Sequence, residues 1–347
     1  MIRTLTAMAG LVAIVLSGQT FAQQKYEMKV AYFVGDHHPL GAWFVRWSDG
    51  VEKASGGRIV VKRFPGAQMG PPPGYYDMAR TGQAEVTQFM HGGTPGRFPV
   101  TELINLPYLI GSGEIGAKVL NDPELRTRYL DAEHKGIKGL VYFTVQPGQV
   151  MTTKKPIRTL EDFKGMRIRF SSPTIRDFIA ALGGTAVGVS PTELAEALQK
   201  GTVDGAFIDY GGAGIAFKLG GIVKHVSEMY SFVTSFGAAM NPDFYNKLPA
   251  DLKKVIDDSM IGQAKELGDG IDSIDGPGKK QIIEGGANAF RLSPEEDAKF
   301  RKAGAEVAEA KIKEMEAKGL PARGAYTLMK SLADKHAKIS RNFWNNN

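Results

Sequence analysis

Residues 164–210 constrain the fold of this chain most, because they read as strand, helix, strand, helix and strand in succession. The stretch begins with Arg167 and Arg169 at alternate positions between apolar residues, a pattern typical of a strand. Predicted helices follow at about 171–182 and 193–199, and predicted strands at 185–189 and 203–208. Such a succession forms a wound α/β sheet, whose ligands bind beyond the carboxyl ends of the strands, where Arg169 lies.

A second unit of the same kind is predicted before this stretch. Its strands are expected at 26–34, 58–64 and 84–89, with helices at about 41–54 and 75–80. Elsewhere, strands are predicted at 139–145 and 232–240, and helices at 114–119, 123–134, from about 249 onward, 293–318 and 326–340. The chain has 347 residues, of which 43% are hydrophobic and 23% charged, enough for two globular domains.

The first 22 residues have the pattern of a secretory signal peptide. Arg3 provides a positive charge, residues 5–16 are almost wholly apolar or small, and cleavage is predicted after Ala22. The apolar run is too short to span a bilayer comfortably, so the mature protein is not expected to be membrane-inserted. The chain contains no cysteine, and therefore no disulfide or lipid-bearing thiol, which favours the periplasm as its location.

The net charge of +6 does not point to a nucleic-acid partner. Lysine pairs such as Lys154-Lys155 and Lys253-Lys254 lie between acidic neighbours, a pattern typical of a solvated mixed surface rather than a basic stripe. A mildly positive protein nevertheless favours anionic ligands through its general electrostatic field.

Motifs for catalysis, metals and cofactors are missing. The sequence has neither a G-x-S-x-G nucleophile elbow nor an H-E-x-x-H zinc helix. Residues 276–280 resemble a phosphate loop only superficially, and the possible dinucleotide motif at Gly212 has Phe217 at its third glycine position. His37 and His38 have no carboxylate or cysteine cluster nearby, so a surface or pocket-lining role is favoured over metal binding. We therefore expect no catalytic residue, metal or cofactor.

A binding role is the remaining interpretation. The planar guanidinium of Arg169 matches a carboxylate, although the pattern alone fits a salt-bridged strand arginine equally well. Gln149 offers a donor, yet a solvated loop glutamine is the commoner case. Aromatic residues gather near strand ends, where they line a pocket or, more commonly, pack in a core. These residues are Tyr32, Phe33, Phe89, Phe207 and Tyr210.

Short motifs occur along essentially the whole mature chain. They are the His38-Pro39 loop, Gly56-Gly57-Arg58, the run from Phe64 to Gly70, Pro156-Ile157, the run from Leu160 to Arg169, the run from Ala197 to Gly205, Met240-Asn241, Phe244, Leu248-Pro249 and Asp251-Leu252. In this order and spacing they resemble the solute-binding proteins of tripartite ATP-independent periplasmic (TRAP) transporters, the type that includes C4-dicarboxylate and sialic acid binders.

The resemblance implies two α/β lobes, joined by crossing strands and a long bracing helix, that close over a ligand. It places the crossing strands near 146–149 and 233–237 and the long helix after Pro249. Lobe I would comprise residues 23–146 plus about 235–274, and lobe II residues 147–234 plus about 275–347. The family's carboxylate-binding arginine, in its K-[IL]-R strand, falls on Arg169.

Departures from the family pattern restrict the class of ligand that we expect. Ile208 stands where many members have a ligand-binding asparagine, and Gln149 lies in the segment where sialic acid binders have a second arginine. An acidic residue of those binders is also missing near Phe89 and Met90. We therefore hypothesise an organic monocarboxylate, with an aromatic acid as the narrower form. The predicted ligand-binding residues are Arg169, Gln149, Phe207, Ile208, Asp209, Phe33, His37, Phe89 and Met90.

The resemblance also implies partners. The protein would deliver its ligand to the membrane permease subunits of a TRAP transporter. Two alternatives are a ligand-binding partner of a sensor and, less favoured, a periplasmic enzyme acting on an organic acid. An enzyme would need a nucleophile or an acid–base pair beside Arg169, and no such group is evident.

Overall fold

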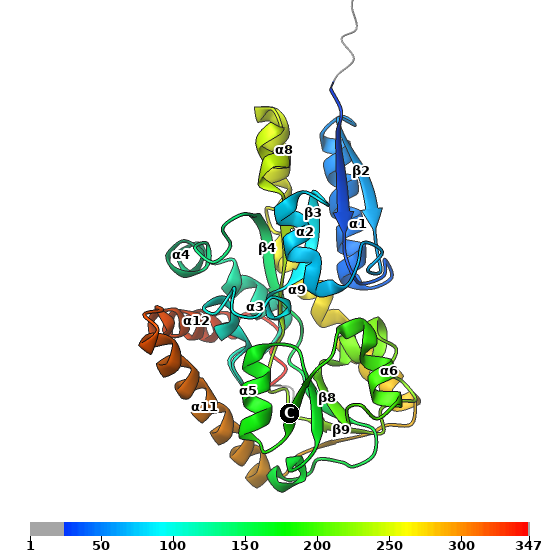
Figure 1. Cartoon of the computed structure of the whole chain (residues 1–347), viewed down its shortest axis with the longest axis vertical. Helices are drawn as coiled ribbons and strands as arrows, with labels where there is room; N and C mark the ends of the chain where they lie inside the picture. Colours follow the sequence, from blue (N-terminus) through cyan, green and yellow to red (C-terminus); the bar gives the residue numbers. More distant parts are fainter. Residues whose placement is uncertain (1–23, 346–347) are drawn as a thin grey trace, which may run out of the picture.

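The computed structural model of the chain describes residues 24–345, so the predicted signal peptide lies outside the described residues. Two lobes, one above the other in Figure 1, each contain one β-sheet flanked by helices. Lobe I is the upper one and lobe II the lower one. The predicted fold class, a two-lobed α/β protein, is therefore confirmed.

The sheet of lobe I has the strand order β2-β1-β3-β10-β4. Its strands are β1 (Tyr26–Ala31), β2 (Ile59–Phe64), β3 (Val86–Met90), β4 (Lys138–Thr144) and β10 (Ser235–Met240). The first three are parallel, as expected for a wound unit, and β10 runs antiparallel between β3 and β4. The helices nearby are α1 (Pro39–Ala54), α2 (Tyr75–Thr81), α3 (Gly113–Leu120) and the short α4 (Pro123–Leu125). The helix predicted at 123–134 ends at Leu130, because α4 continues as a π-helical segment, Arg126–Leu130.

The sheet of lobe II has the order β11-β9-β5-β8-β6-β7. Its strands are β5 (Gln149–Thr152), β6 (Arg167–Phe170), β7 (Thr185–Gly188), β8 (Gly205–Ile208), β9 (His225–Glu228) and β11 (Asn288–Arg291). Helices α5 (Pro173–Ala181) and α6 (Leu194–Gln199) connect the parallel strands β6, β7 and β8. The strand–helix succession predicted at 164–210 is therefore present, whereas β9 and β11 were not predicted.

Two chain segments cross between the lobes side by side. Residues 145–148 lead from β4 to β5, and residues 229–234 lead from β9 to β10. The Val145 amide donates to the Thr234 carbonyl over 3.1 Å, and the Gly148 amide donates to the Phe232 carbonyl over 2.6 Å. These hydrogen bonds lie where crossing strands were expected.

The expected long helix is divided into three. It consists of α8 (Ala250–Ser259), α9 (Gln263–Ser273) and α10 (Asp275–Glu284), preceded by α7 (Pro242–Lys247). Gly262, with a φ of 79°, separates α8 from α9, because a left-handed residue cannot continue a helix. The series crosses from lobe I to lobe II at Ile274, where the Gln146 side chain donates to the Ile271 carbonyl over 2.7 Å.

The C-terminal region contains α11 (Pro294–Ala317) and α12 (Ala322–His336). Helix α11 packs on α5 of lobe II, but α12 packs on α3 of lobe I. The apolar face of α12, with Ala322, Ala325 and Met329, belongs to the hydrophobic core of lobe I. Assigning all of residues 275–347 to lobe II therefore needs correction at its C-terminal end.

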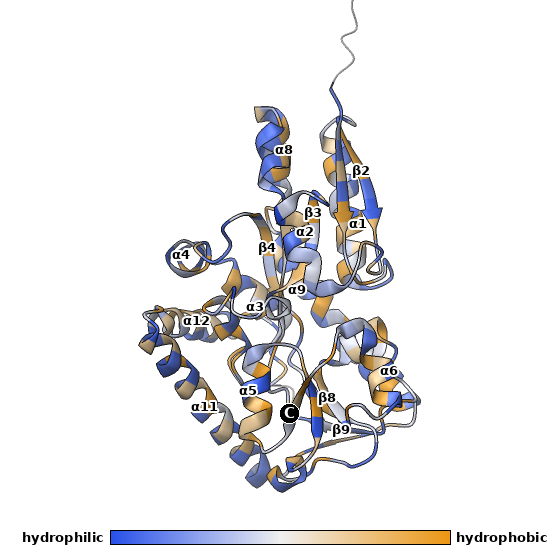
Figure 2. Cartoon of the chain, viewed as in Figure 1, coloured by the Kyte–Doolittle hydropathy of each residue, from blue (hydrophilic) through white to orange (hydrophobic). Residues whose placement is uncertain are grey.

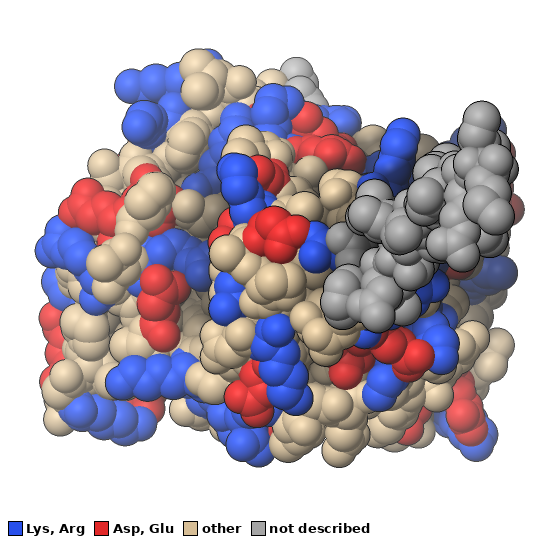
Figure 3. All heavy atoms as spheres, turned by 90° about the horizontal axis from the view of Figure 1, so that it is seen from above, with Lys and Arg blue, Asp and Glu red and all other residues tan. Residues whose placement is uncertain are grey.

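The surface carries both positive and negative side chains, as the sequence predicted. Figure 2 shows hydrophilic and hydrophobic residues on different sides of α8, α11 and α12. Figure 3 shows Lys and Arg interspersed with Asp and Glu over the visible part of the upper face, without a basic stripe. Within residues 24–345, no helix combines the length and apolar character needed to cross a membrane.

We expect Gly278→Ala to destabilise the protein, because it disturbs the packing of α10 on lobe II. A Cβ at Gly278 would lie 2.1 Å from the Tyr210 carbonyl oxygen, because α10 rests directly on the backbone of lobe II. The free energy of unfolding in urea should fall by about 1–3 kcal/mol. The control Gly50→Ala, in α1 with nothing within 4 Å of its Cβ, should instead gain about 0.5–1 kcal/mol. A loss in the control equal to that in Gly278→Ala would contradict the contact argument.

Candidate functional site

Arg169 lies in the interior of lobe II at the carboxyl end of β6. Its neighbours in the sheet are Val187 of β7 and Ala206 of β8, and only 5% of its surface is exposed. Its Nε donates to the Val189 carbonyl over 3.2 Å, and no carboxylate in the described part of the chain forms an ion pair with it. Buried arginines are normally paired, so the two terminal nitrogens of Arg169 are available for an anion from outside the chain.

Arg167 on the same strand shows the alternative arrangement. It is exposed, and its guanidinium binds both oxygens of Asp204, over 2.7 Å and 3.1 Å. The salt-bridge interpretation that the sequence left open therefore applies to Arg167 and not to Arg169.

Asp209 is the carboxyl group that acts electrostatically on Arg169. Burial raises the pKa of Asp209 to about 6, against the opposing effects of the Gly212 amide and of Arg169. Burial lowers the pKa of Arg169 to about 10, against the opposing effect of Asp209, so the guanidinium is charged at neutral pH. The site thus combines one buried cation with one nearby acid that is not hydrogen-bonded to it.

A cavity of about 300 Å³ lies between the lobes. Lobe I contributes Phe33, Val34, Gly35 and Gly66, and lobe II contributes Pro191, Thr192, Ala195, Ala216 and Phe217. Arg169 is not among the lining residues, but Val189, whose carbonyl accepts a hydrogen bond from its Nε, precedes the lining residue Pro191 by two positions. The walls are mostly apolar, with an aromatic side chain from each lobe.

Three predicted residues of lobe I lie at the boundary between the lobes. Phe33 lines the cavity and makes an edge contact with Tyr75, at 5.8 Å between ring centroids. His37 is exposed and lines a neighbouring opening of about 500 Å³. Met90 ends β3 just before Gly92, where a Cβ would lie 2.6 Å from the Ser171 carbonyl oxygen of lobe II.

Phe89 and Phe207 lie in the lobe cores, which corrects their predicted role. Phe207 is fully buried and contacts the rings of Phe178 and Phe232, at centroid distances of 5.7 Å and 5.0 Å. Its neighbour Ile208 points to the other face of the sheet, which Arg169 shares, because side chains alternate along a strand. Phe89 packs among Tyr76, Phe98 and Tyr142 in lobe I.

Gln149 has a structural role that sequence reasoning missed. It is completely buried, and its Oε1 accepts hydrogen bonds from the amides of Met229 and Tyr230, over 2.7 Å and 3.0 Å. Its Nε2 donates to the Pro147 carbonyl over 3.3 Å. Gln149 therefore holds the two crossing segments together, and its Oε1 already accepts two hydrogen bonds.

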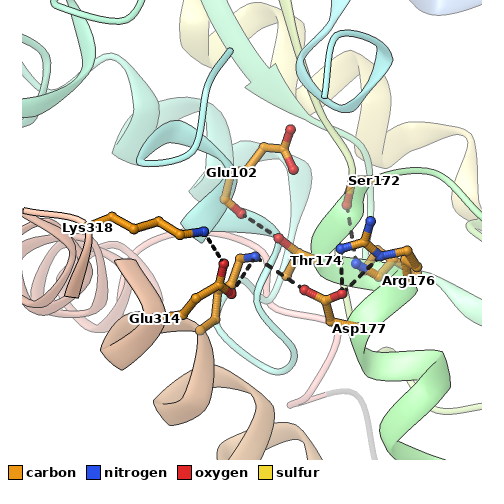
Figure 4. A network of polar contacts seen from close by, with 9 residues as sticks. Glu102, Ser172, Thr174, Arg176, Asp177, Glu314 and Lys318 are labelled. Carbon is orange, nitrogen blue, oxygen red and sulfur yellow. Dashed lines mark hydrogen bonds and ion pairs between the residues drawn. The ribbon is translucent and has the colours of Figure 1, made fainter. Parts of the chain in front are cut away.

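The lobes also meet at a polar network beside the crossing (Figure 4). Thr174 of α5 donates to the Glu102 carbonyl of lobe I over 3.4 Å, and Lys311 of α11 lies 3.3 Å from Asp177 of α5. Figure 4 shows the Glu102 carboxylate pointing away from the charged groups of α5 and α11. Burial raises the pKa of Glu102 to about 8, and its Oε1 has no hydrogen-bond partner in the described part of the chain.

Comparison with known proteins identifies the family to which the chain belongs. Residues 30–315 match the DctP family model, described as bacterial extracellular solute-binding protein, family 7. The chain is 28% identical over 158 residues to the uncharacterized protein YiiZ of Salmonella typhimurium. That match covers 45% of this chain and 48% of the relative, so it spans about half of each.

Two solved structures are similar over nearly the whole chain. One is a TRAP solute binding protein from Rhodoferax ferrireducens in complex with copurified benzoate, with a TM-score of 0.85 and 27% identity, covering 91% of this chain and all of that one. The other is a marine metagenome TRAP solute binding protein specific for aromatic acid ligands, in complex with metahydroxyphenylacetate. Its TM-score is 0.84 and its identity 29%, covering 90% of this chain and 99% of that one.

Gln149→Ala should destabilise the protein even without ligand. The substitution leaves the buried amide of Met229 and the partly buried amide of Tyr230 without an acceptor, and the buried group alone costs about 1–3 kcal/mol. Chemical unfolding measures this loss. The control Gln68→Ala removes an exposed glutamine and should change the unfolding free energy by less than about 0.5 kcal/mol. Wild-type stability in Gln149→Ala would refute the structural role.

Glu102→Gln should change how stability depends on pH. The folded-state pKa of Glu102, about 8, lies above its ordinary value of 4.5, so the folded state binds more protons and wild-type stability falls as pH rises through this window. The variant has no carboxyl group to ionise at this position. Its free energy of unfolding should therefore rise by a few kcal/mol relative to that of wild type between pH 5 and pH 8. Unfolding at both pH values measures it, with the exposed Glu306→Gln as control. A pH-independent difference would contradict the argument.

Proposed function

This chain belongs to family 7 of the bacterial extracellular solute-binding proteins and is a TRAP solute-binding protein; we propose that it captures an aromatic monocarboxylate in the periplasm. The family consists of substrate-binding transport components rather than enzymes. In this proposal the ligand lies between the lobes, and the closed protein delivers it to the membrane permease of the transporter.

The observation that carries the proposal is the buried guanidinium of Arg169, which forms no ion pair with any carboxylate of the described residues. Its terminal nitrogens form a planar fork that can donate two parallel hydrogen bonds to a carboxylate. Burial excludes water from this pair and strengthens the charge-assisted hydrogen bonds. A ligand carboxylate would supply the partner that the chain itself does not provide.

The cavity walls support an aromatic body for this acid. Phe33 and Phe217 provide rings, while Gly35, Gly66 and Ala195 leave space for a flat group. Two similar structures contain benzoate and metahydroxyphenylacetate, which supports the same ligand class for this chain. A second carboxylate is not favoured, because Gln149 already binds the crossing segments.

Ligand binding would couple to lobe closure. The cavity has one wall on each lobe, so a ligand that contacts both stabilises the closed arrangement over the open one. The crossing segments are the natural hinge, because closure about them changes few contacts within either core.

We expect Arg169→Ala to weaken binding of benzoate and 3-hydroxybenzoate by at least about 30-fold, because the substitution leaves a buried ligand charge unpaired. Arg169→Lys should be intermediate, since lysine keeps the charge but loses the planar fork. Isothermal titration calorimetry on protein stripped of copurified ligand measures these affinities.

Arg167→Ala is the matched control for this experiment. It removes an arginine two residues away on the same strand, but one that is exposed and paired with Asp204. Its affinity for both acids should stay within about twofold of wild type. Equal losses in both variants, or none in Arg169→Ala, would contradict the proposed role of Arg169.

A further inference from the structure

We infer that Asp209 limits the negative charge that the site accepts, so that a monoanionic acid is bound in preference to a dianionic acid of the same shape. This inference rests on the proposed binding of a carboxylate by Arg169. It assigns Asp209 a role in specificity rather than direct contact with the ligand.

The fold holds Asp209 close to Arg169 without pairing the two. Strands β6 and β8 are parallel neighbours in which Arg169 is paired with Ala206, and Asp209 follows β8 at the same edge of the sheet, near enough to act electrostatically on Arg169. Both residues are buried, with 5% and 8% of their surfaces exposed. Asp209 Oδ1 accepts a hydrogen bond from the Gly212 amide over 2.6 Å, which fixes the carboxyl group in the turn that follows β8.

The charges of Arg169 and Asp209 offset each other. Arg169 and Asp209 together carry no net charge, so one ligand carboxylate brings the site to −1 and a second would bring it to −2. Like charges repel strongly where water is excluded. The cavity walls offer no cation to offset a second carboxylate, because Phe33, Ala195 and Phe217 are apolar.

Protonation of Asp209 should reduce the discrimination against dianionic ligands. The charged groups that face it are Arg169 from β6 and Asp275 from α10, together with the amides of Gly211 and Gly212. Burial raises the pKa of Asp209 to about 6, so its negative charge is present at pH 7.5 and mostly lost at pH 5. Discrimination against dianions should therefore weaken on acidification.

The test compares isophthalate, a dianion, with 3-carbamoylbenzoate, a monoanion of nearly the same shape, by calorimetry at pH 7.5. Wild type should bind the monoanion at least about tenfold more tightly. Asp209→Asn keeps an oxygen for the Gly212 amide but removes the charge, and should reduce this preference by about tenfold. Asp209→Ser provides a second variant should the first fail to fold.

Asp275→Asn is the matched control. Asp275 is also a buried acid near the crossing and interacts with Asp209, but it is not among the groups that shift the pKa of Arg169. The preference of this variant should equal that of wild type. An independent arm uses the Asp275→Asn variant, because burial raises the pKa of Asp275 to about 7 and wild type would lose that charge over the same range. The ligands are 3-sulfobenzoate and 3-sulfamoylbenzoate, whose charges do not change between pH 7.5 and pH 5. The preference for the monoanion should fall at pH 5.

The outcomes separate the two proposals. Unchanged preference in the Asp209 variants, with benzoate binding still dependent on Arg169, overturns the inference about Asp209 and leaves the proposed function intact. Failure of wild type to bind any aromatic acid, or binding that is insensitive to Arg169→Ala, overturns the proposed function and with it this inference.

Discussion

The charge of Arg169, buried in lobe II without an ion pair, is the constraint on which the rest of the structure depends. Desolvating a guanidinium is costly, and the single hydrogen bond to the Val189 carbonyl does not offset that cost. The sheet fixes the backbone of Arg169, with β7 and β8 on either side of β6, and the nearby carboxylate of Asp209 offsets part of the cost electrostatically. The arrangement is one in which an external carboxylate stabilises the protein by restoring the missing partner.

Each lobe has its own apolar interior, and the lobes are connected by polar contacts together with α11, which contributes Phe300 to a core of lobe II and Ile312 to the core of lobe I. One large core belongs to lobe I, and two smaller ones belong to lobe II. Between them lie the hydrogen bonds of the crossing segments, the amides held by Gln149 and the network around Glu102 (Figure 4). Polar contacts of this kind can rearrange without exposing a core, which is what closure over a ligand requires.

Local sequence patterns were sufficient for the elements around Arg169. Alternating residues and a helix start at Ser172-Pro173 are short-range signals, and the family resemblance supplied the two-lobed arrangement. Which face of a strand is covered is a long-range property. Phe207 and Ile208 therefore could not be assigned to core or cleft from alternation alone, and the role of Gln149 depends on amides about 80 residues away. The last helix was assigned to the wrong lobe for the same reason, since its amphipathic pattern does not identify its partner.

A crystal structure of the protein with benzoate bound would test the central claim most directly. The account predicts both carboxylate oxygens at about 2.7–2.9 Å from the terminal nitrogens of Arg169, with the ring between Phe33 and Phe217. A carboxylate bound elsewhere in the cleft, with Arg169 paired to a carboxylate of the protein itself, would contradict it.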